Sequence, residues 1–77
     1  MGEIENTAMK IIHAYEDYYL DKEKRKILDN LFDRFLSIVD INGQMDIYEA
    51  TVALSRSHPK EYAELLKALK DESLISD

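Results

Sequence analysis

The scarcity of helix-breaking residues most constrains the fold of this chain. Among 77 residues there are two glycines and one proline, and only Gly43 and Pro59 lie away from the chain start. Each separates stretches in which apolar residues recur every three or four positions, the spacing of one face of an α-helix. We find no alternation typical of a β-strand and no internal repeat. The sequence therefore predicts an all-α protein.

Four helical segments with short connections follow from this periodicity, over about residues 3–20, 22–39, 47–56 and 60–69. We expect a small three- or four-helix bundle in which segment 22–39 is the central helix. A chain of this length has room for one domain, so residues 1–77 should form a single helical domain. The surface-scaling relation gives roughly 4,900 Å² of exposed surface after folding. Leu74 and Ile75 either extend the last helix or dock separately.

The helix boundaries are predicted from local signals. Asp21 is a good N-cap, so we expect a break there rather than one long bent helix. Gly43 follows an asparagine in the clearest loop, where a positive φ is readily adopted. Asp46 with Glu49 three residues later resembles a capping box for the third helix. Pro59 fits only the first turn of the fourth helix, with Ser57 or His58 as its cap.

Composition and charge disfavour several classes of function. The chain has no cysteine, which excludes disulfides and cysteine-based zinc sites. It carries 10 Lys and Arg against 16 Asp and Glu, a net charge of −6. Residues 1–40 and 41–77 each contribute −3, so the acidity looks evenly spread along the sequence. Because nucleic-acid affinity depends on basic residues that neutralise phosphates, this balance does not favour DNA or RNA as a partner.

Targeting signals are also not evident in the sequence. No apolar run approaches the roughly 20 residues that a membrane span requires. The first residues have neither the basic start nor the apolar centre of a signal peptide. We therefore expect a cytoplasmic protein with no membrane association.

Catalytic motifs are not found. The sequence has no cysteine nucleophile, no glycine-rich phosphate loop and no Gly-x-Ser-x-Gly turn. The five serines have no evident His and Asp partners. We predict that the protein is not an enzyme, uses no cofactor and takes no small-molecule substrate.

Two groups of residues bear on metal binding. His13, Glu16 and Asp17 share one helical face, but a zinc or transition-metal site usually needs a further ligand, often a second histidine. The other histidine lies far along the chain at position 58. We predict no metal site at either histidine.

A second arrangement resembles pieces of an EF-hand. Asp40, Asn42 and Glu49 match ligand positions 1, 3 and 12 of that calcium-binding loop, but only if two residues are deleted. Without the deletion, Met45 stands at the glycine position and Thr51 at the position of the bidentate glutamate. This departure favours a plain corner between two helices, capped by Asp46, over calcium binding.

The tyrosine content is the most informative feature for function. The chain has five tyrosines and two phenylalanines. This ratio suits contact surfaces that are partly exposed to solvent, because tyrosine combines apolar area with a hydroxyl. In one interpretation Tyr15 and Tyr18 complete the core with their hydroxyls in solvent. Tyr19 and Leu20 cannot face the same way, however, so the first helix carries more apolar surface than one packed stripe needs.

We therefore predict a partner-binding surface at the end of the first helix, formed by Tyr15, Glu16, Asp17, Tyr18 and Tyr19. The expected function is that of a small, acidic, non-enzymatic protein-binding module, an adaptor, regulator or inhibitor of the kind that phages and mobile elements encode. Its partner would be another protein or a second copy of the chain. The acidic residues at the rim would draw it towards a basic surface.

Two alternatives remain open. The first is a small helical DNA-binding transcriptional regulator, because two short helices meet at a brief turn near Pro59. A basic cluster at residues 22–26 also suits phosphate, although acidic neighbours offset most of its charge. The second alternative is a nucleic-acid mimic that blocks a DNA- or RNA-handling protein. In that case Asp29, Asp33 and Asp40 would imitate phosphates.

Overall fold

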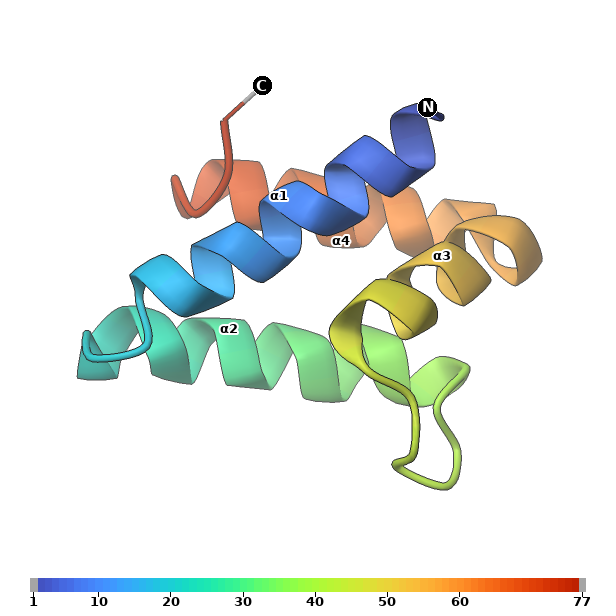
Figure 1. Ribbon diagram of the computed structural model, residues 1–77, viewed down its shortest axis with the longest axis horizontal. Coiled ribbons are helices and arrows are strands. Elements are labelled where there is room, and N and C mark those ends of the chain that lie inside the picture. Colours follow the sequence, from blue (N-terminus) through green and yellow to red (C-terminus); the bar gives the residue numbers. More distant parts are fainter. Residues whose placement is uncertain (1, 77) are drawn as a thin grey trace.

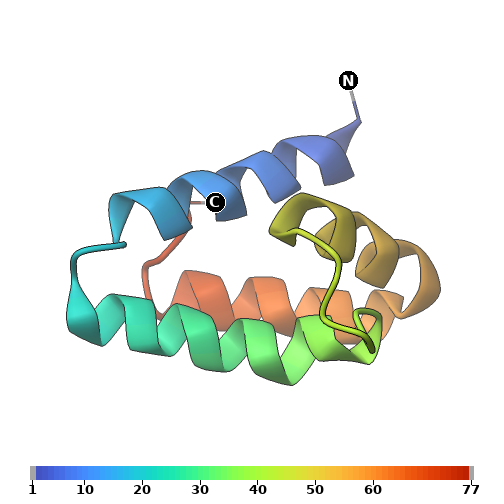
Figure 2. The same ribbon diagram turned by 60° about the horizontal axis from the view of Figure 1, so that its bottom comes forward.

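The computed structural model describes residues 2–76, which form four α-helices and a 3-10 turn. These are α1 (Glu3–Asp17), α2 (Lys22–Phe35), η1 (Leu36–Ile38), α3 (Ile47–Ser57) and α4 (Pro59–Asp71). The described residues contain no β-strand, which confirms the all-α prediction. In Figure 2, α1 and α3 form one layer and α2 and α4 the other. Within residues 2–76, no helix combines the length and the apolar character needed to cross a membrane.

The hydrophobic core draws on every helix. Ile11 of α1, Leu28 of α2, Leu54 of α3 and Leu65 of α4 are fully buried and belong to one cluster. Half-buried aromatic and aliphatic side chains pack around it. The molecule has a radius of gyration of 11.4 Å and exposes 5245 Å² of surface.

The helix with the broadest contacts is α3, which packs against α1, α4 and η1. Segment 22–39 packs against α4 through α2 and against α3 through η1, so the prediction that it is the central helix is not confirmed. Backbones approach closely where the side chains between them are small. The buried residues of α3 include Ala50 and Thr51, whereas the apolar face of α2 carries Leu28, Phe32 and Phe35.

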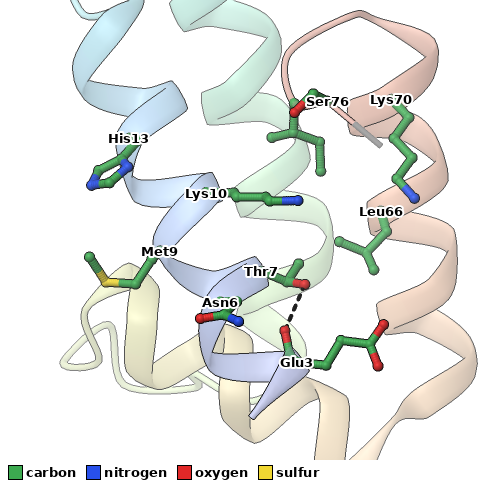
Figure 3. A pocket seen from close by; sticks show the side chains of 10 residues that line it. Glu3, Asn6, Thr7, Met9, Lys10, His13, Leu66, Lys70 and Ser76 are labelled. Atoms are coloured by element: carbon green, nitrogen blue, oxygen red, sulfur yellow. Dashed lines mark hydrogen bonds between the residues drawn. The ribbon is translucent and has the colours of Figure 1, made fainter. Parts of the chain in front are cut away.

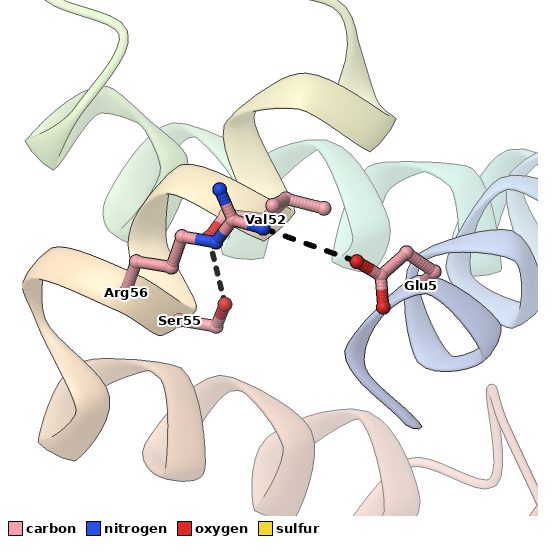
Figure 4. Close-up of polar contacts among 4 residues, drawn as sticks. All are labelled: Glu5, Val52, Ser55 and Arg56. Atoms are coloured by element: carbon pink, nitrogen blue, oxygen red, sulfur yellow. Dashed lines mark hydrogen bonds and ion pairs between the residues drawn. The ribbon is translucent and has the colours of Figure 1, made fainter. Parts of the chain in front are cut away.

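An ion pair also joins α3 to α1. The Arg56 guanidinium lies 4.0 Å from the Glu5 carboxylate, and nearby the Ser55 hydroxyl donates to the Val52 carbonyl at 2.7 Å (Figure 4). An exposed pair of this kind contributes about 0–1 kcal/mol. The contact between the two helices therefore depends mainly on buried apolar surface.

The connection between α1 and α2 is a short turn. The periodicity predicts a first helix to residue 20, but α1 ends at Asp17 because the chain then turns back, with the Asp21 amide donating to the Tyr18 carbonyl at 3.0 Å. The Asp21 carboxylate accepts from the Lys24 amide at 3.2 Å. The predicted break and the predicted N-cap of the second helix are confirmed.

The connection between η1 and α3 is closed by two aspartates. The Asp40 carboxylate accepts from the amides of Gln44 at 2.8 Å and Met45 at 3.1 Å. Gly43 has φ of +67°, as its position in the turn predicts. The Asp46 carboxylate accepts from the Glu49 amide at 2.7 Å, which confirms the predicted cap of α3.

The last helix begins at Pro59, which occupies the first turn as predicted. His58 is its N-cap, although the His58 side chain makes no capping hydrogen bond. Beyond α4 the chain turns at Ser73, whose φ is 57°. Leu74 then docks into the core instead of extending the helix, and its amide donates to the Leu69 carbonyl at 2.9 Å.

Candidate functional site

Three tyrosines gather where α1 ends and α2 begins, at the left of Figure 1. The ring centroid of Tyr15 lies 5.8 Å from that of Phe32 on α2. It lies 6.1 Å from the Tyr19 ring, to which it is nearly perpendicular. Tyr18 is half-buried against the core, as is Tyr15. We call Tyr15, Tyr18, Tyr19 and the adjoining Leu20 the tyrosine corner.

The exposure of these four side chains is uneven. Tyr15 and Tyr18 contribute to the core, as the more conservative interpretation of the sequence expects. Tyr19 is 49% exposed, and Leu20 is 91% exposed in the turn that follows α1. The exposed apolar surface predicted for this region is therefore present, but Tyr19 and Leu20 form it rather than all three tyrosines.

Two cations from α2 lie over the tyrosine rings. The Lys24 ammonium is 4.9 Å from the ring centroid of Tyr18, and the Arg25 guanidinium is 4.3 Å from that of Tyr19. Arg25 also lies 3.7 Å from the Asp29 carboxylate. Exposed cation–π contacts contribute about 0.5–1 kcal/mol each. The Arg25 contact holds the Tyr19 ring in place while about half of its surface remains free.

The sequence pattern offers only a weak signal for these contacts. In both pairs the tyrosine and the cation are six residues apart in sequence. On one continuous helix, two residues at this spacing lie on different faces and do not contact each other. The turn at Asp21 brings them together. The basic cluster at the start of α2 therefore has a structural role at the corner, besides any role in recognition.

Glu16 and Asp17 are exposed on the last turn of α1. Carboxylates are unfavourable there because the C-terminal end of a helix carries a partial negative charge. Between residues 15 and 26 there are four acidic and four basic side chains, so this segment has no net charge. The rim of the tyrosine corner is therefore mixed in charge rather than acidic.

The negative charge of the molecule is concentrated elsewhere. Residues 27–50 contain five carboxylates and one arginine, which gives −4 of the total of −6. Four of these carboxylates line one groove of about 310 Å³ between α2, η1 and the start of α3. We call it the aspartate groove, after Asp29, Asp33, Asp40 and Asp46. It brings together the three aspartates considered as phosphate mimics.

The candidate metal ligands His13, Asp40 and His58 lie in different parts of the fold. Among residues 2–76, no three His, Asp or Glu side chains are grouped so that they could hold a metal ion. His13 is exposed on α1, and the Nδ1 atom of His58 lies 2.9 Å from the Ser57 hydroxyl. Asp40, from the EF-hand-like segment, uses its carboxylate to bind backbone amides of its own loop.

A further groove of about 540 Å³ lies between α1, α4 and the segment after α4 (Figure 3). Lys10 and Leu66 extend into it, and Met9 and His13 also line it. The Thr7 hydroxyl donates to the Glu3 carbonyl at 3.0 Å within its own helix.

The helix pair considered for DNA reading consists of α3 and α4, which pack against each other. The charged residues of α4 are mixed in sign, three basic and three acidic: Lys60, Lys67 and Lys70, and Glu61, Glu64 and Asp71. This mixed surface offers little net attraction for phosphates.

No protein-family model, curated protein or solved structure matches this chain.

Proposed function

We propose that this protein is a non-enzymatic protein-binding module that acts as an adaptor, regulator or inhibitor of a larger protein through its tyrosine corner. The observation that supports this function is the exposure of Leu20 beside a half-exposed Tyr19, at 91% and 49%. Both lie in a turn, between a helix that ends and a helix that begins. A folded chain gains nothing in stability from an apolar side chain left in water.

The corner has the properties of an energetic centre for binding. Full burial of a leucine side chain contributes about 1.5–3 kcal/mol, and tyrosine is enriched among the residues that dominate binding energy. The Tyr19 ring is already held by Arg25 and Tyr15. Its ordering therefore costs less on association than that of a free side chain.

The molecule is large enough to form an interface of ordinary size. An interface of ordinary size buries about 800 Å² on each side, which is about 15% of the 5245 Å² that this molecule exposes. Tyr19 and Leu20 would form its centre, and Glu16 and Asp17 would lie at its rim. Because the charge of this rim is mixed, it permits contact with a partner surface that carries both positive and negative charges.

Capture from a lysate of the native cells tests the proposal. The Tyr19→Ser/Leu20→Ser variant removes the exposed apolar surface and leaves the half-buried Tyr15 and Tyr18 unsubstituted. We expect the captured partner, once purified, to bind this variant at least about tenfold more weakly than wild type. The control is Met9→Ser, which removes an exposed apolar side chain from the other half of α1. Unchanged binding by the double variant would contradict the proposed surface.

A second measurement separates a larger partner from self-association. Size-exclusion chromatography with light scattering should give a monomer for the purified wild-type chain. A dimer that the Tyr19→Ser/Leu20→Ser variant dissociates would instead place a second copy on the corner. In a salt-titrated shift assay with random duplex DNA we expect no retention, which separates this function from the DNA-binding alternative.

A further inference from the structure

The aspartate groove combines an apolar floor with a carboxylate rim. Its floor is formed by apolar side chains of three elements: Phe32, Leu36, Ile47 and Ala50. Met45, which is 36% exposed, also lines it. Ile41, in the loop that contributes Met45, is 84% exposed. Apolar area therefore remains open to solvent at the most acidic part of the molecule.

The carboxylates at this rim are held in place. The Asp40 carboxylate accepts two backbone hydrogen bonds and that of Asp46 accepts one, so both are oriented before any partner arrives. Asp33 is exposed on α2. Within a groove that has low-dielectric walls, charges of one sign reinforce each other and attract the opposite charge. The preferred occupant is therefore cationic.

We propose that the aspartate groove binds a cationic, amphipathic segment of a partner protein. Lysine or arginine side chains of that segment would pair with the aspartates, and one of its apolar side chains would lie on the floor between Leu36 and Ile47. Most of this surface lies towards the C-terminal end of α2, and the tyrosine corner lies at its start. Two groove residues are near both surfaces, because Asp29 pairs with Arg25 and the Phe32 ring lies 5.8 Å from that of Tyr15. The proposal rests on the groove residues alone and does not depend on the function proposed above.

The geometry favours such a segment over other cationic ligands. A volume of about 310 Å³ is at the small end of ligand sites and suits a few side chains. The carboxylates are not grouped to hold a metal ion among the described residues. A phosphate mimic needs only a row of charges, and neither the apolar floor nor the exposed Met45 would contribute to it.

The test removes charge and preserves the fold. The groove variant carries Asp→Asn at positions 29, 33, 40 and 46. Asparagine keeps an oxygen that can accept the backbone hydrogen bonds, and it caps helices about as well as aspartate. The control variant removes four carboxylates around α4 instead, with Glu61→Gln, Glu64→Gln, Asp71→Asn and Glu72→Gln. Both variants have the same net charge, so they differ only in where the charge is lost.

The probe is a short fluorescent peptide that alternates lysine with leucine, measured by fluorescence anisotropy at about 0.15 M salt, where exposed charges are screened beyond about 8 Å. We expect the groove variant to bind it at least about tenfold more weakly than wild type, and the control variant to stay within about threefold. The Tyr19→Ser/Leu20→Ser variant should bind like wild type, which separates this proposal from the function proposed above.

A lysine–serine peptide of equal charge tests the apolar floor. We expect it to bind wild type at least about fivefold more weakly than the lysine–leucine peptide. Equal affinity for both peptides would overturn the proposal and favour a nucleic-acid mimic. Equal losses in the groove and control variants would also overturn it, because binding would then follow net charge alone. In amide NMR spectra, the lysine–leucine peptide should shift the resonances of Leu36, Met45 and Ala50, and shifts confined to α4 would contradict the site.

Discussion

The hydroxyl of Thr51 is fully buried in α3 and has no hydrogen-bond partner among the described residues. An unsatisfied buried polar group costs about 1–3 kcal/mol. Thr51→Val keeps the shape of the side chain and removes that group, so we expect the free energy of unfolding in urea to rise by about 1 kcal/mol. The control is Thr7→Val, which removes a hydroxyl that is hydrogen-bonded to Glu3 and should give no gain. A loss of stability in Thr51→Val would contradict this account.

For single residues, the sequence predicts which residue types gather at a surface better than it predicts which of them face solvent. The cluster of tyrosines at the end of α1 is visible in the sequence, but the division between half-buried Tyr18 and exposed Tyr19 is set by where α1 stops. The contact of Arg25 with Tyr19 depends on the same turn. Thr51 is harder still to predict, since its burial follows from how α3 packs.

The end of α4 shows how a local backbone conformation closes an element. The Ser73 amide donates to the Lys70 carbonyl at 3.0 Å and the Leu74 amide to the Leu69 carbonyl at 2.9 Å, the two hydrogen bonds of a Schellman cap. Ser73 adopts a left-handed φ of 57°, which glycine tolerates better than serine. We expect Ser73→Gly to raise the free energy of unfolding by about 0.5–1 kcal/mol, measured in urea. A decrease would show that the Ser73 side chain contributes more than the strain costs.

Element boundaries are well predicted where a few neighbouring residues decide them. Asp21, Gly43, Asp46 and Pro59 each act through their own backbone or through an amide three residues away, so their positions mark the breaks correctly. The end of α2 is different. Its apolar pattern continues to residue 39, but the α-helix gives way to a 3-10 turn after Phe35. Periodicity does not distinguish these two helix types over a single turn.

Across the whole molecule, size is predicted more accurately than arrangement. Surface scaling gives roughly 4,900 Å², close to the 5245 Å² observed. The distribution of charge is not evident from halves of the chain, because a division at residue 40 cuts through the segment that forms the aspartate groove. Helix packing places Asp29 and Asp46 in one groove, although they are far apart in sequence.

The two proposed surfaces lie towards different ends of α2 and approach each other at Asp29 and Phe32, so one molecule could contact a partner at two places. Two linked contacts strengthen binding when the partner can reach both at once. Combining Tyr19→Ser/Leu20→Ser with the four groove substitutions distinguishes one partner from two. If one partner contacts both surfaces, each set of substitutions alone should weaken its binding and the combined variant should lose at least the sum of the two effects in free energy. With two partners, each ligand would respond to its own surface only.

Site-specific photo-crosslinking in the native cells tests the central claim most directly. A photoreactive phenylalanine analogue replaces Tyr19 in one variant and Glu64, which is exposed on α4, in the other. We predict a discrete crosslinked protein adduct from position 19 and none from position 64. Adducts of equal yield from both positions, or from position 64 alone, would contradict a partner surface at the tyrosine corner.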